Sequence, residues 1–278
     1  MKANMKSPLV IAEDESLGAA VWREIRREAS IMVESEPALA SYYYAAILKH
    51  NSLVQALGFE LANKLNAETV PAMLLREVIQ GVIAEHPAII EATVRDICAH
   101  RDRDPACDKF STPLLHFKGF HALQAYRISH QLWLQGRQYL ALYLQNRISQ
   151  QFAVDIHPGA RIGSGIMLDH ATGIVIGETA VLGDDISILH GVTLGGIGCE
   201  AGDRHPKVRD GVLISVGAKI LGNITIGEGA RIGAGSVVLD DVPPYTTVAG
   251  VPGKIVGRGS EKHPALSMDH FWEKMNGE

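Results

Sequence analysis

The second half of the chain carries an aliphatic residue at every sixth position, and this period constrains the fold more than any other feature. The aliphatic positions form three runs: Ile156, Ile162 and Leu168; Ile176, Leu182, Ile188 and Leu194; Ile214, Ile220, Ile226, Ile232 and Val238. A period of six fits neither one face of an α-helix nor a strand whose residues alternate. It fits a coil of short parallel strands in which three hexapeptides complete one turn and the aliphatic side chains stack inside.

The hexapeptide period breaks at two places. Leu168 and Ile176 are eight residues apart, and Leu194 and Ile214 are twenty apart. The second gap, residues 195–211, is polar and rich in glycine, so we interpret it as a loop that leaves the coil. Asp169 and His170 stand in the first break, and the run Asp203–Pro206 stands in the second. A repeat is expected to deviate from its pattern where a functional site interrupts it.

The first half of the chain has a helical period. Apolar residues recur at intervals of three and four within residues 22–32, 54–65 and 74–82, which predicts helices there. Two further helices are expected over about 114–135 and from Gly136 to about 151. The fold class is therefore α+β, with a helical domain at 1–151, a β-helix domain at 152–258 and a flexible tail at 259–278.

Composition excludes several classes of protein. The net charge of -5 gives no reason to expect nucleic acid as a partner. No apolar stretch approaches the ~20 residues of a membrane span, and the apolar run near the N-terminus is too short for a signal peptide. The three widely spaced cysteines, Cys98, Cys107 and Cys199, indicate free thiols in a reducing compartment, so we expect a cytoplasmic protein without a zinc knuckle.

The residues at the two breaks suit acid–base chemistry on an amino acid. His170 is the candidate general base, because a neutral imidazole accepts a proton near neutral pH. Asp155 is its candidate partner: it lies fifteen residues earlier, and a coil turn is expected to hold ~18 residues. Asp169 would bind a cationic group, while Arg204 and His205 would bind a carboxylate.

Other polar residues have simpler interpretations. We interpret His157 as structural, His190 as a corner or interface residue, and Asp104 as a turn or helix-cap residue. Lys254 and Arg258 would be surface charges, and Cys199 receives no role because nothing nearby lowers its pKa visibly.

Several motifs together identify a family. The stretch VDIHPGARIGSGIMLDHATGIVIGETAVLGDDISIL, followed by GVTLGG, GDRHPK and GAKILGNITIG, resembles the serine O-acetyltransferases. The helical stretch RDRDPACDKFSTPLLHFKGFHALQAYRISHQLW is similar to the N-terminal domain of that family, so the resemblance covers roughly residues 20–258. It implies a left-handed parallel β-helix that transfers acetyl from acetyl-CoA to the hydroxyl of L-serine, the first step of cysteine synthesis from serine.

The resemblance also implies roles for individual residues. His170 would be the general base with Asp155 as its partner, Asp104 and Asp169 would contact the serine ammonium, and Arg204 and His205 its carboxylate. The CoA-binding residues would be Gly196, Val216, Ala234, and Lys254 or Arg258. Val216 stands where a smaller residue is expected. The reaction would be direct transfer in a ternary complex that uses no metal and no cofactor besides the co-substrate acetyl-CoA.

Assembly and regulation follow from the same resemblance. The family forms trimers through the coil, with sites between subunits, and pairs them into hexamers through the helical domain. L-Cysteine commonly inhibits at the serine site. Members that bind O-acetylserine sulfhydrylase do so through a tail ending in isoleucine. This chain ends in Phe271–Glu278 without one, so the complex stays an open alternative and is not an expectation.

Three other functions remain open at this stage. An acetyltransferase acting on a sugar or antibiotic hydroxyl would share the histidine base but would lack the amino-acid cradle of Asp104, Asp169, Arg204 and His205. A zinc hydratase of the γ-carbonic-anhydrase kind would need three histidines on one metal. His157, His170, His190 and His205 supply the number, although no two of them form a closely spaced pair. A scaffold without activity would leave Asp169, His170 and the loop unexplained.

Overall fold

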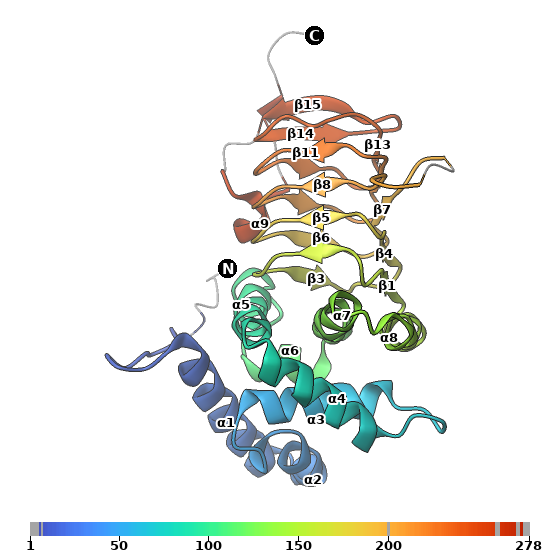
Figure 1. Cartoon of the computed structure of the whole chain (residues 1–278). Coiled ribbons are helices and arrows are strands. Elements are labelled where there is room, and N and C mark those ends of the chain that lie inside the picture. The colour runs from blue at the N-terminus through green and yellow to red at the C-terminus, as the bar shows by residue number, and fades with distance from the viewer. Residues whose placement is uncertain (1–5, 7, 199–200, 259–261, 271–272, 275–278) are drawn as a thin grey trace. The chain divides into compact units, whose positions relative to one another are not determined.

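The computed structural model describes residues 6, 8–198, 201–258, 262–270 and 273–274. They form two compact units, which divide between Phe117 and Lys118. Figure 1 shows the order of the elements: helices come first, and short strands stacked in layers follow. Within the described residues, no helix has the length and apolar character that crossing a membrane requires.

The first unit is helical. Its elements are α1 (Leu17–Ser35), η1 (Pro37–Leu39), α2 (Ala40–Tyr43), η2 (Tyr44–Leu48), α3 (Leu53–Leu65), α4 (Ala72–Glu85), α5 (Ala88–Arg103) and α6 (Ser111–His116). The three helices predicted from apolar spacing fall within α1, α3 and α4. The hydroxyls of Ser16 and Ser52 cap α1 and α3 by accepting main-chain N–H groups of their first turns.

The second unit begins with α7 (Lys118–Leu134) and α8 (Gln138–Phe152) and continues as the coil. The strands of the first face are β1 (Val154–Ile156), β4 (Ile174–Ile176), β7 (Thr193–Gly195), β10 (Lys219–Leu221) and β13 (Val237–Val238). The second face has β2 (Arg161–Ile162), β5 (Val181–Leu182), β8 (Lys207–Val208) and β11 (Thr225–Ile226). The third has β3 (Met167–Asp169), β6 (Ser187–Leu189), β9 (Leu213–Ile214), β12 (Arg231–Ile232), β14 (Thr246–Ala249), β15 (Lys254–Arg258) and β16 (Glu273–Lys274).

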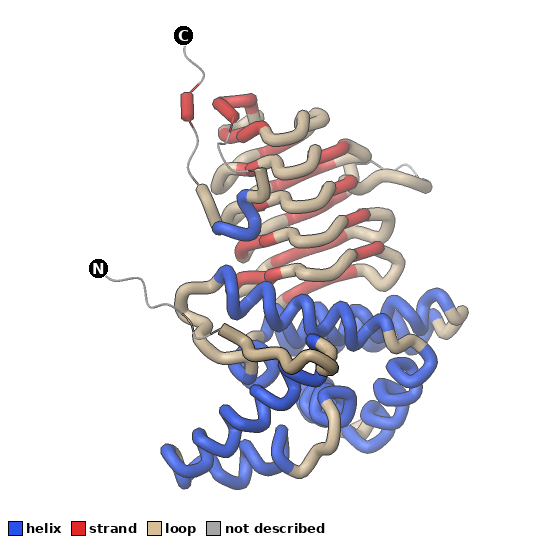
Figure 2. The backbone as a smooth tube through the Cα atoms, turned by 90° about the vertical axis from the view of Figure 1, so that its left-hand side faces the viewer, coloured by secondary structure: helices blue, strands red, loops and turns tan. Residues whose placement is uncertain are grey.

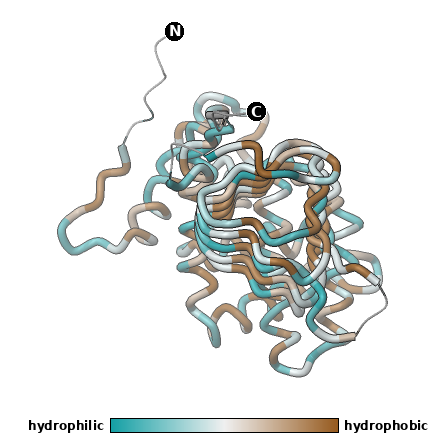
Figure 3. Tube along the Cα trace, turned by 90° about the horizontal axis from the view of Figure 1, so that it is seen from above, coloured by the Kyte–Doolittle hydropathy of each residue, from teal (hydrophilic) through white to brown (hydrophobic). Residues whose placement is uncertain are grey.

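These three faces confirm the parallel β-helix that the hexapeptide period predicts. The repeated aliphatic residues are buried, for example Ile176 at 1%, Leu194 at 0% and Ile220 at 0% exposure. Seen from above, successive turns of the coil overlie one another (Figure 3). Burying one column of aliphatic side chains is therefore what ties each turn to the next.

The strand register explains the first break. Val175 pairs with Thr193, eighteen residues later, whereas Asp155 pairs with Val175, twenty residues later. The first turn therefore holds two residues more than a regular one, and they are accommodated at the corner between β3 and β4, beside His170. The second break is the loop between β7 and β8, which projects from the stacked strands (Figure 2).

Helices α7 and α8 belong with the coil. The Tyr126 hydroxyl donates to the Ala160 carbonyl, and the Arg127 guanidinium donates to the Gly163 carbonyl at 2.7 Å. Gly119 lies so close to the first turn that a Cβ atom there would be 2.3 Å from the Leu168 carbonyl oxygen. The expected boundary at residues 151 and 152 therefore marks the change from helix to strand, but the compact units divide earlier because these helices pack on the coil.

Part of the segment expected to be a flexible tail also packs on the coil. Helix α9 (Pro264–Ser267) lies on the third face, where the Ser187 hydroxyl donates to the Ala265 carbonyl at 2.9 Å. Arg231 forms an ion pair of 2.9 Å with Asp269. Polar groups of the third face thus contact residues 262–270 of the segment that was expected to be flexible. Residues 275–278, which bear on the sulfhydrylase complex, and Cys199 lie outside the described residues.

Candidate functional site

The first candidate group lies at the corner between the third and first faces, residues 169–173, which we call the His170 corner. His170 and Ala171 have φ angles of 54° and 59°, a region that L side chains rarely occupy. Two such residues in succession are unfavourable, and backbone of this kind is concentrated at functional sites. The His170 side chain is 76% exposed, so this corner presents an accessible imidazole.

Two neighbouring groups approach the His170 ring. Its Nε2 atom lies 3.8 Å from a carboxylate oxygen of Asp169. The His190 ring, one turn further along the coil, meets it edge to face with 5.9 Å between ring centroids. The sequence predicted His190 as a corner or interface residue, and the structure places it on the corner directly after β6. One chain therefore presents two imidazoles on successive turns of the same corner.

Asp155 does not form the predicted pair with His170 in the single chain. Its carboxylate accepts a hydrogen bond from the Gln145 side chain at 2.7 Å. Its strand partner is Val175, five residues beyond His170, because this turn is longer than the regular turn that the prediction assumed. Within the described residues, no hydrogen bond joins the two side chains.

The second candidate group lies at the corner between the first and second faces, where the loop returns to the coil. We call residues 177–179 and 203–207 the Arg204 corner. The Arg204 guanidinium donates to the Glu178 carboxylate at 2.7 Å, and this hydrogen bond lowers the pKa of that carboxyl group. The Lys207 ammonium donates to the Asp203 carboxylate at 2.6 Å and to the His205 carbonyl at 2.6 Å, which ties the end of the loop to β8.

His205 is held more tightly than its place beside a long loop suggests. It is 7% exposed, and its Nδ1 atom lies 2.9 Å from the Thr179 hydroxyl. Burial, the largest effect, lowers the pKa of its imidazole below the ordinary value, and the neighbouring Arg204 charge acts in the same direction. The ring is therefore suited to act as a neutral hydrogen-bond donor or acceptor beside the Arg204 guanidinium.

The residues predicted to bind CoA divide between the two corners. Val216 and Ala234 continue the line of His170 and His190 along the coil: the Gly217 N–H donates to the His190 carbonyl at 2.9 Å, and the Gly235 N–H donates to the Val216 carbonyl at 2.8 Å. Gly196 lies at the other corner, where a Cβ atom would be 3.3 Å from Arg204.

The two candidate phosphate contacts lie at opposite ends of one strand. Lys254 pairs with Ala249, next to the turn that ends β14, and Arg258 pairs with Thr246 at the other end of β15. The turn after Ala249 is joined to the first face, because the Val237 N–H donates to the Gly250 carbonyl at 3.0 Å. Lys254 therefore continues the line of the His170 corner, whereas Arg258 does not.

Asp104 belongs to the other compact unit. It follows α5, and its carboxylate accepts the Ala106 N–H at 2.8 Å, which is the turn role that the sequence suggests. Sequence reasoning missed Glu178, Thr179 and Gln145, which contact Arg204, His205 and Asp155. The first two lie in the motif Gly177–Glu178–Thr179, directly after a buried hexapeptide position, so their place at a corner was the available signal.

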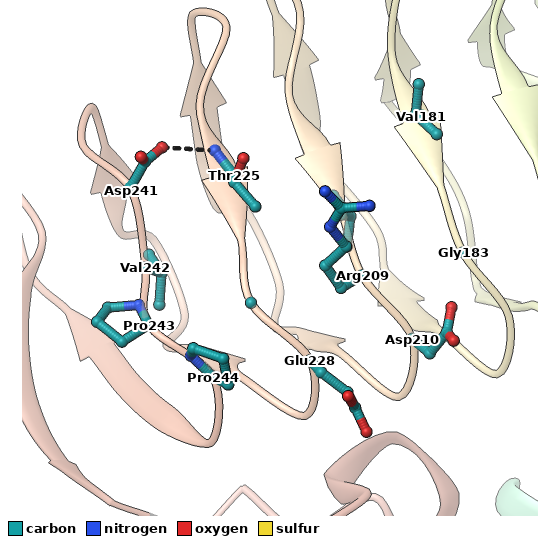
Figure 4. Close-up of a pocket in the computed structure, with 12 residues that line it drawn as sticks. Val181, Gly183, Arg209, Asp210, Thr225, Glu228, Asp241, Val242, Pro243 and Pro244 are labelled. Atoms are coloured by element: carbon teal, nitrogen blue, oxygen red, sulfur yellow. Dashed lines mark hydrogen bonds between the residues drawn. The ribbon is translucent and has the colours of Figure 1, made fainter.

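The second face carries a groove of about 600 Å³ that contains none of the predicted site residues. Two of its acidic side chains accept hydrogen bonds from the main chain of the coil: Asp241 accepts the Thr225 N–H at 2.7 Å (Figure 4), and Asp210 accepts the Asp184 N–H at 2.8 Å. These two carboxylates stabilise turns of the coil. We therefore do not take the groove as the functional site.

His157, the last of the four histidines considered as metal ligands, has structural contacts. His157 accepts the Gly159 N–H at 2.9 Å and packs on the Trp133 ring with 5.1 Å between centroids. Among the residues that the structure describes, no three His, Cys, Asp or Glu side chains are arranged as metal ligands.

Comparison with known proteins gives concordant results for both halves of the chain. Residues 21–125 match the family "Serine acetyltransferase, N-terminal", and residues 205–240 match "Bacterial transferase hexapeptide (six repeats)". The serine acetyltransferase of Escherichia coli K12 is 58% identical over 92% of this chain and 94% of its own length.

Solved structures agree with the fold. The serine acetyltransferase of Vibrio cholerae matches with a TM-score of 0.90 and 61% identity, over 90% of this chain and 97% of that chain. A soybean serine acetyltransferase complexed with serine has a TM-score of 0.85 and 56% identity, over 87% and 99%. Other solved serine acetyltransferases, 57% and 58% identical, are complexes with cysteine (TM-score 0.89, over 91% and 98%) and with CoA (0.83, over 86% and 100%).

Proposed function

Because the chain belongs to the serine acetyltransferase family of acyltransferases, we propose that it transfers the acetyl group of acetyl-CoA to the hydroxyl of L-serine with His170 as the general base. The observation that carries this assignment of roles is the pair of corners. One presents an exposed imidazole beside a carboxylate, and the other presents a guanidinium beside a buried imidazole. The solved relatives complexed with serine and with CoA support the two substrates.

In the proposed reaction, His170 takes the hydroxyl proton as the serine oxygen attacks the thioester carbonyl, because a serine hydroxyl is too weak an acid to ionise beforehand. The new C–O bond forms, the carbonyl oxygen becomes an oxyanion, and the C–S bond then breaks. The protonated imidazole returns its proton to the departing CoA sulfur. The transfer takes place within a ternary complex, so the enzyme carries no acyl group of its own.

The ammonium and the carboxylate of the amino acid are held by different groups. Asp169, next to the base, binds the ammonium, with Asp104 as a second contact. Arg204 and His205 bind the carboxylate, and Glu178 keeps the guanidinium in place before the substrate arrives.

A second chain completes this site in the proposed assembly. On one chain the first face separates the His170 corner from the Arg204 corner, and a strand of three residues spans roughly 10 Å at the usual rise per residue. Neighbouring coils in a trimer would bring the His170 corner of one chain to the Arg204 corner of the next. Asp155 is proposed as the carboxylate partner of His170 in this assembly. The helical domain 1–151 would pair trimers into hexamers.

CoA is proposed to lie along the line that begins at the His170 corner. Val216 and Ala234 follow His190 on successive turns at this corner of the coil. The glycines beside them, Gly217 and Gly235, have no side chain that would occupy the surface there. Lys254 is placed to meet a phosphate at the end of that line, which makes it a better candidate than Arg258. Gly196 would contribute from the Arg204 corner of the neighbouring chain.

Cysteine biosynthesis is the pathway of this family, and L-cysteine is proposed to inhibit by occupying the serine site. A solved relative complexed with cysteine supports this. We propose a cytoplasmic setting on the basis of the free cysteines.

Product identification tests the proposal. The protein is incubated with acetyl-CoA and L-serine, and the acetylated product is identified by mass spectrometry and proton NMR. O-Acetyl-L-serine is the expected product. Acetylation of a hexose or an aminoglycoside hydroxyl, with none on serine, would contradict the proposal and favour the rival acetyltransferase function.

A further inference from the structure

Thr179 forms hydrogen bonds with both Arg204 and His205 at the Arg204 corner. Its hydroxyl oxygen accepts the main-chain N–H of Arg204 at 3.0 Å and the main-chain N–H of His205 at 3.2 Å. Its own main-chain N–H donates to the His205 Nδ1 atom at 3.2 Å. One side chain thus joins the coil corner to both predicted carboxylate-binding residues.

These contacts determine which ring nitrogen of His205 carries the proton. An N–H group cannot accept, so Nδ1 must be the acceptor towards the Thr179 main chain and carries a lone pair. The hydroxyl oxygen already accepts two N–H groups, which directs its proton to Nδ1, 2.9 Å away. The neutral ring must then bear its hydrogen on Nε2.

The ring is also fixed in position. A Cβ atom on Gly177 would lie 2.0 Å from the ring atoms Cδ2 and Nε2, so the imidazole rests directly against the Gly177 backbone. Among the described residues, the hydrogen bonds of the His205 ring are made at Nδ1. The ring therefore offers its Nε2–H as a donor next to the Arg204 guanidinium.

We propose that Thr179 is a positioning residue that holds His205 as the Nε2–H tautomer, so that this ring donates a hydrogen bond to an anionic oxygen of the bound amino acid. The inference rests on the proposed function, since it takes the ligand to be the serine carboxylate. Thr179 itself does not touch the substrate. It acts on the substrate through the His205 ring.

The test uses steady-state kinetics of the full-length protein with L-serine and acetyl-CoA. Thr179→Val removes the hydroxyl at nearly constant volume, and Thr179→Ser restores it. Thr247→Val is the matched control, because the Thr247 hydroxyl is buried without a hydrogen-bond partner among the described residues and lies on the third face. We expect Thr179→Val to raise the KM for L-serine about tenfold and to leave the KM for acetyl-CoA near the parent value.

A double-mutant cycle separates this role from a merely structural one. In a His205→Ala background, Thr179→Val should have little further effect on the KM for L-serine, since its contribution passes through His205. Thr179→Ser should restore the parent KM, and the thermal unfolding midpoint of Thr179→Val should stay within a few degrees of Thr247→Val.

Three results would overturn the proposal. The first is an unchanged KM for L-serine in Thr179→Val, and the second is an equal rise of that KM in the presence and absence of His205. The third is a KM for L-serine in Thr179→Ser that stays above the parent value. If the parent protein shows no serine-dependent release of CoA, the proposed function fails as well. Activity of the parent therefore distinguishes a wrong function from a wrong role for Thr179.

Discussion

His170 and His205 lie at different corners of the same β-helix, one before the first face and one after it. His170 follows β3, and His205 precedes β8. The strand between the corners keeps the proposed base apart from the proposed carboxylate site within one chain. We propose that another copy of the chain supplies the missing corner, so that the two groups act on one small amino acid.

Mixed oligomers test this arrangement. His170→Ala and Arg204→Ala should each abolish most of the activity, because one removes the base and the other removes the carboxylate contact. When the two variants are co-expressed with different tags and the mixed species is purified, some sites should contain both intact residues and regain activity. Mixed oligomers as inactive as either parent variant would show that each chain uses its own two corners.

Gly177→Ala should impair the use of serine. The new methyl group would lie 2.0 Å from the His205 ring, so the ring must move or the corner must open. We expect kcat/KM for L-serine to fall about tenfold or more, in line with displacement of a substrate-binding group. Gly81→Ala is the control, because no heavy atom lies within 4 Å of its Cβ position. Equal activities of the two variants would contradict this account of the corner.

The repeat was predictable because each hexapeptide buries one aliphatic side chain, and that requirement is local. The positions of Ile176 and Leu194 in the coil could therefore be predicted from the sequence alone. The corners were only partly predictable. His170 was predicted because it interrupts the period. Its predicted pairing with Asp155 assumed a regular turn, whereas this turn holds two additional residues. The signal for Glu178 and Thr179 was their place directly after a buried hexapeptide position. The sequence could not show which residues they contact, because Arg204 and His205 lie about one loop-containing turn away.

The C-terminal segment gave no periodic signal either, and its packing leads to a prediction. The Arg231 side chain is 3% exposed and pairs with Asp269. Removing one partner of a buried ion pair is costly, so Asp269→Asn should lower the free energy of unfolding of the coil by about 3 kcal/mol. Limited proteolysis should then cut the chain near residue 262 sooner. Asp108→Asn, which breaks an exposed pair with Lys109, should change stability by less than about 1 kcal/mol. Equal stability of the two variants would show that Asp269 does not anchor the segment.

The helical unit should lose stability in acid through His100. Burial lowers the pKa of this imidazole to about 3, and its ring packs on Phe117. Because the folded pKa lies below the unfolded value, the contribution to stability is present above the unfolded pKa and is lost as the pH falls toward 3. Urea unfolding of the full chain between pH 7 and 4 should therefore show a steeper pH dependence for the parent than for His100→Gln. Parallel pH profiles would contradict this assignment.

The most direct measurement is CoA release from acetyl-CoA, followed with a thiol reagent, with and without L-serine, for the parent and for His170→Ala. The account predicts serine-dependent release by the parent and a loss of roughly 10²–10⁴-fold in kcat for the variant, since removing a general base has an effect of that size. Intact oligomers of both proteins, checked by gel filtration, would exclude misfolding as the cause. Serine-dependent release that survives in His170→Ala would contradict the role of His170, and its absence from the folded parent would contradict the function itself.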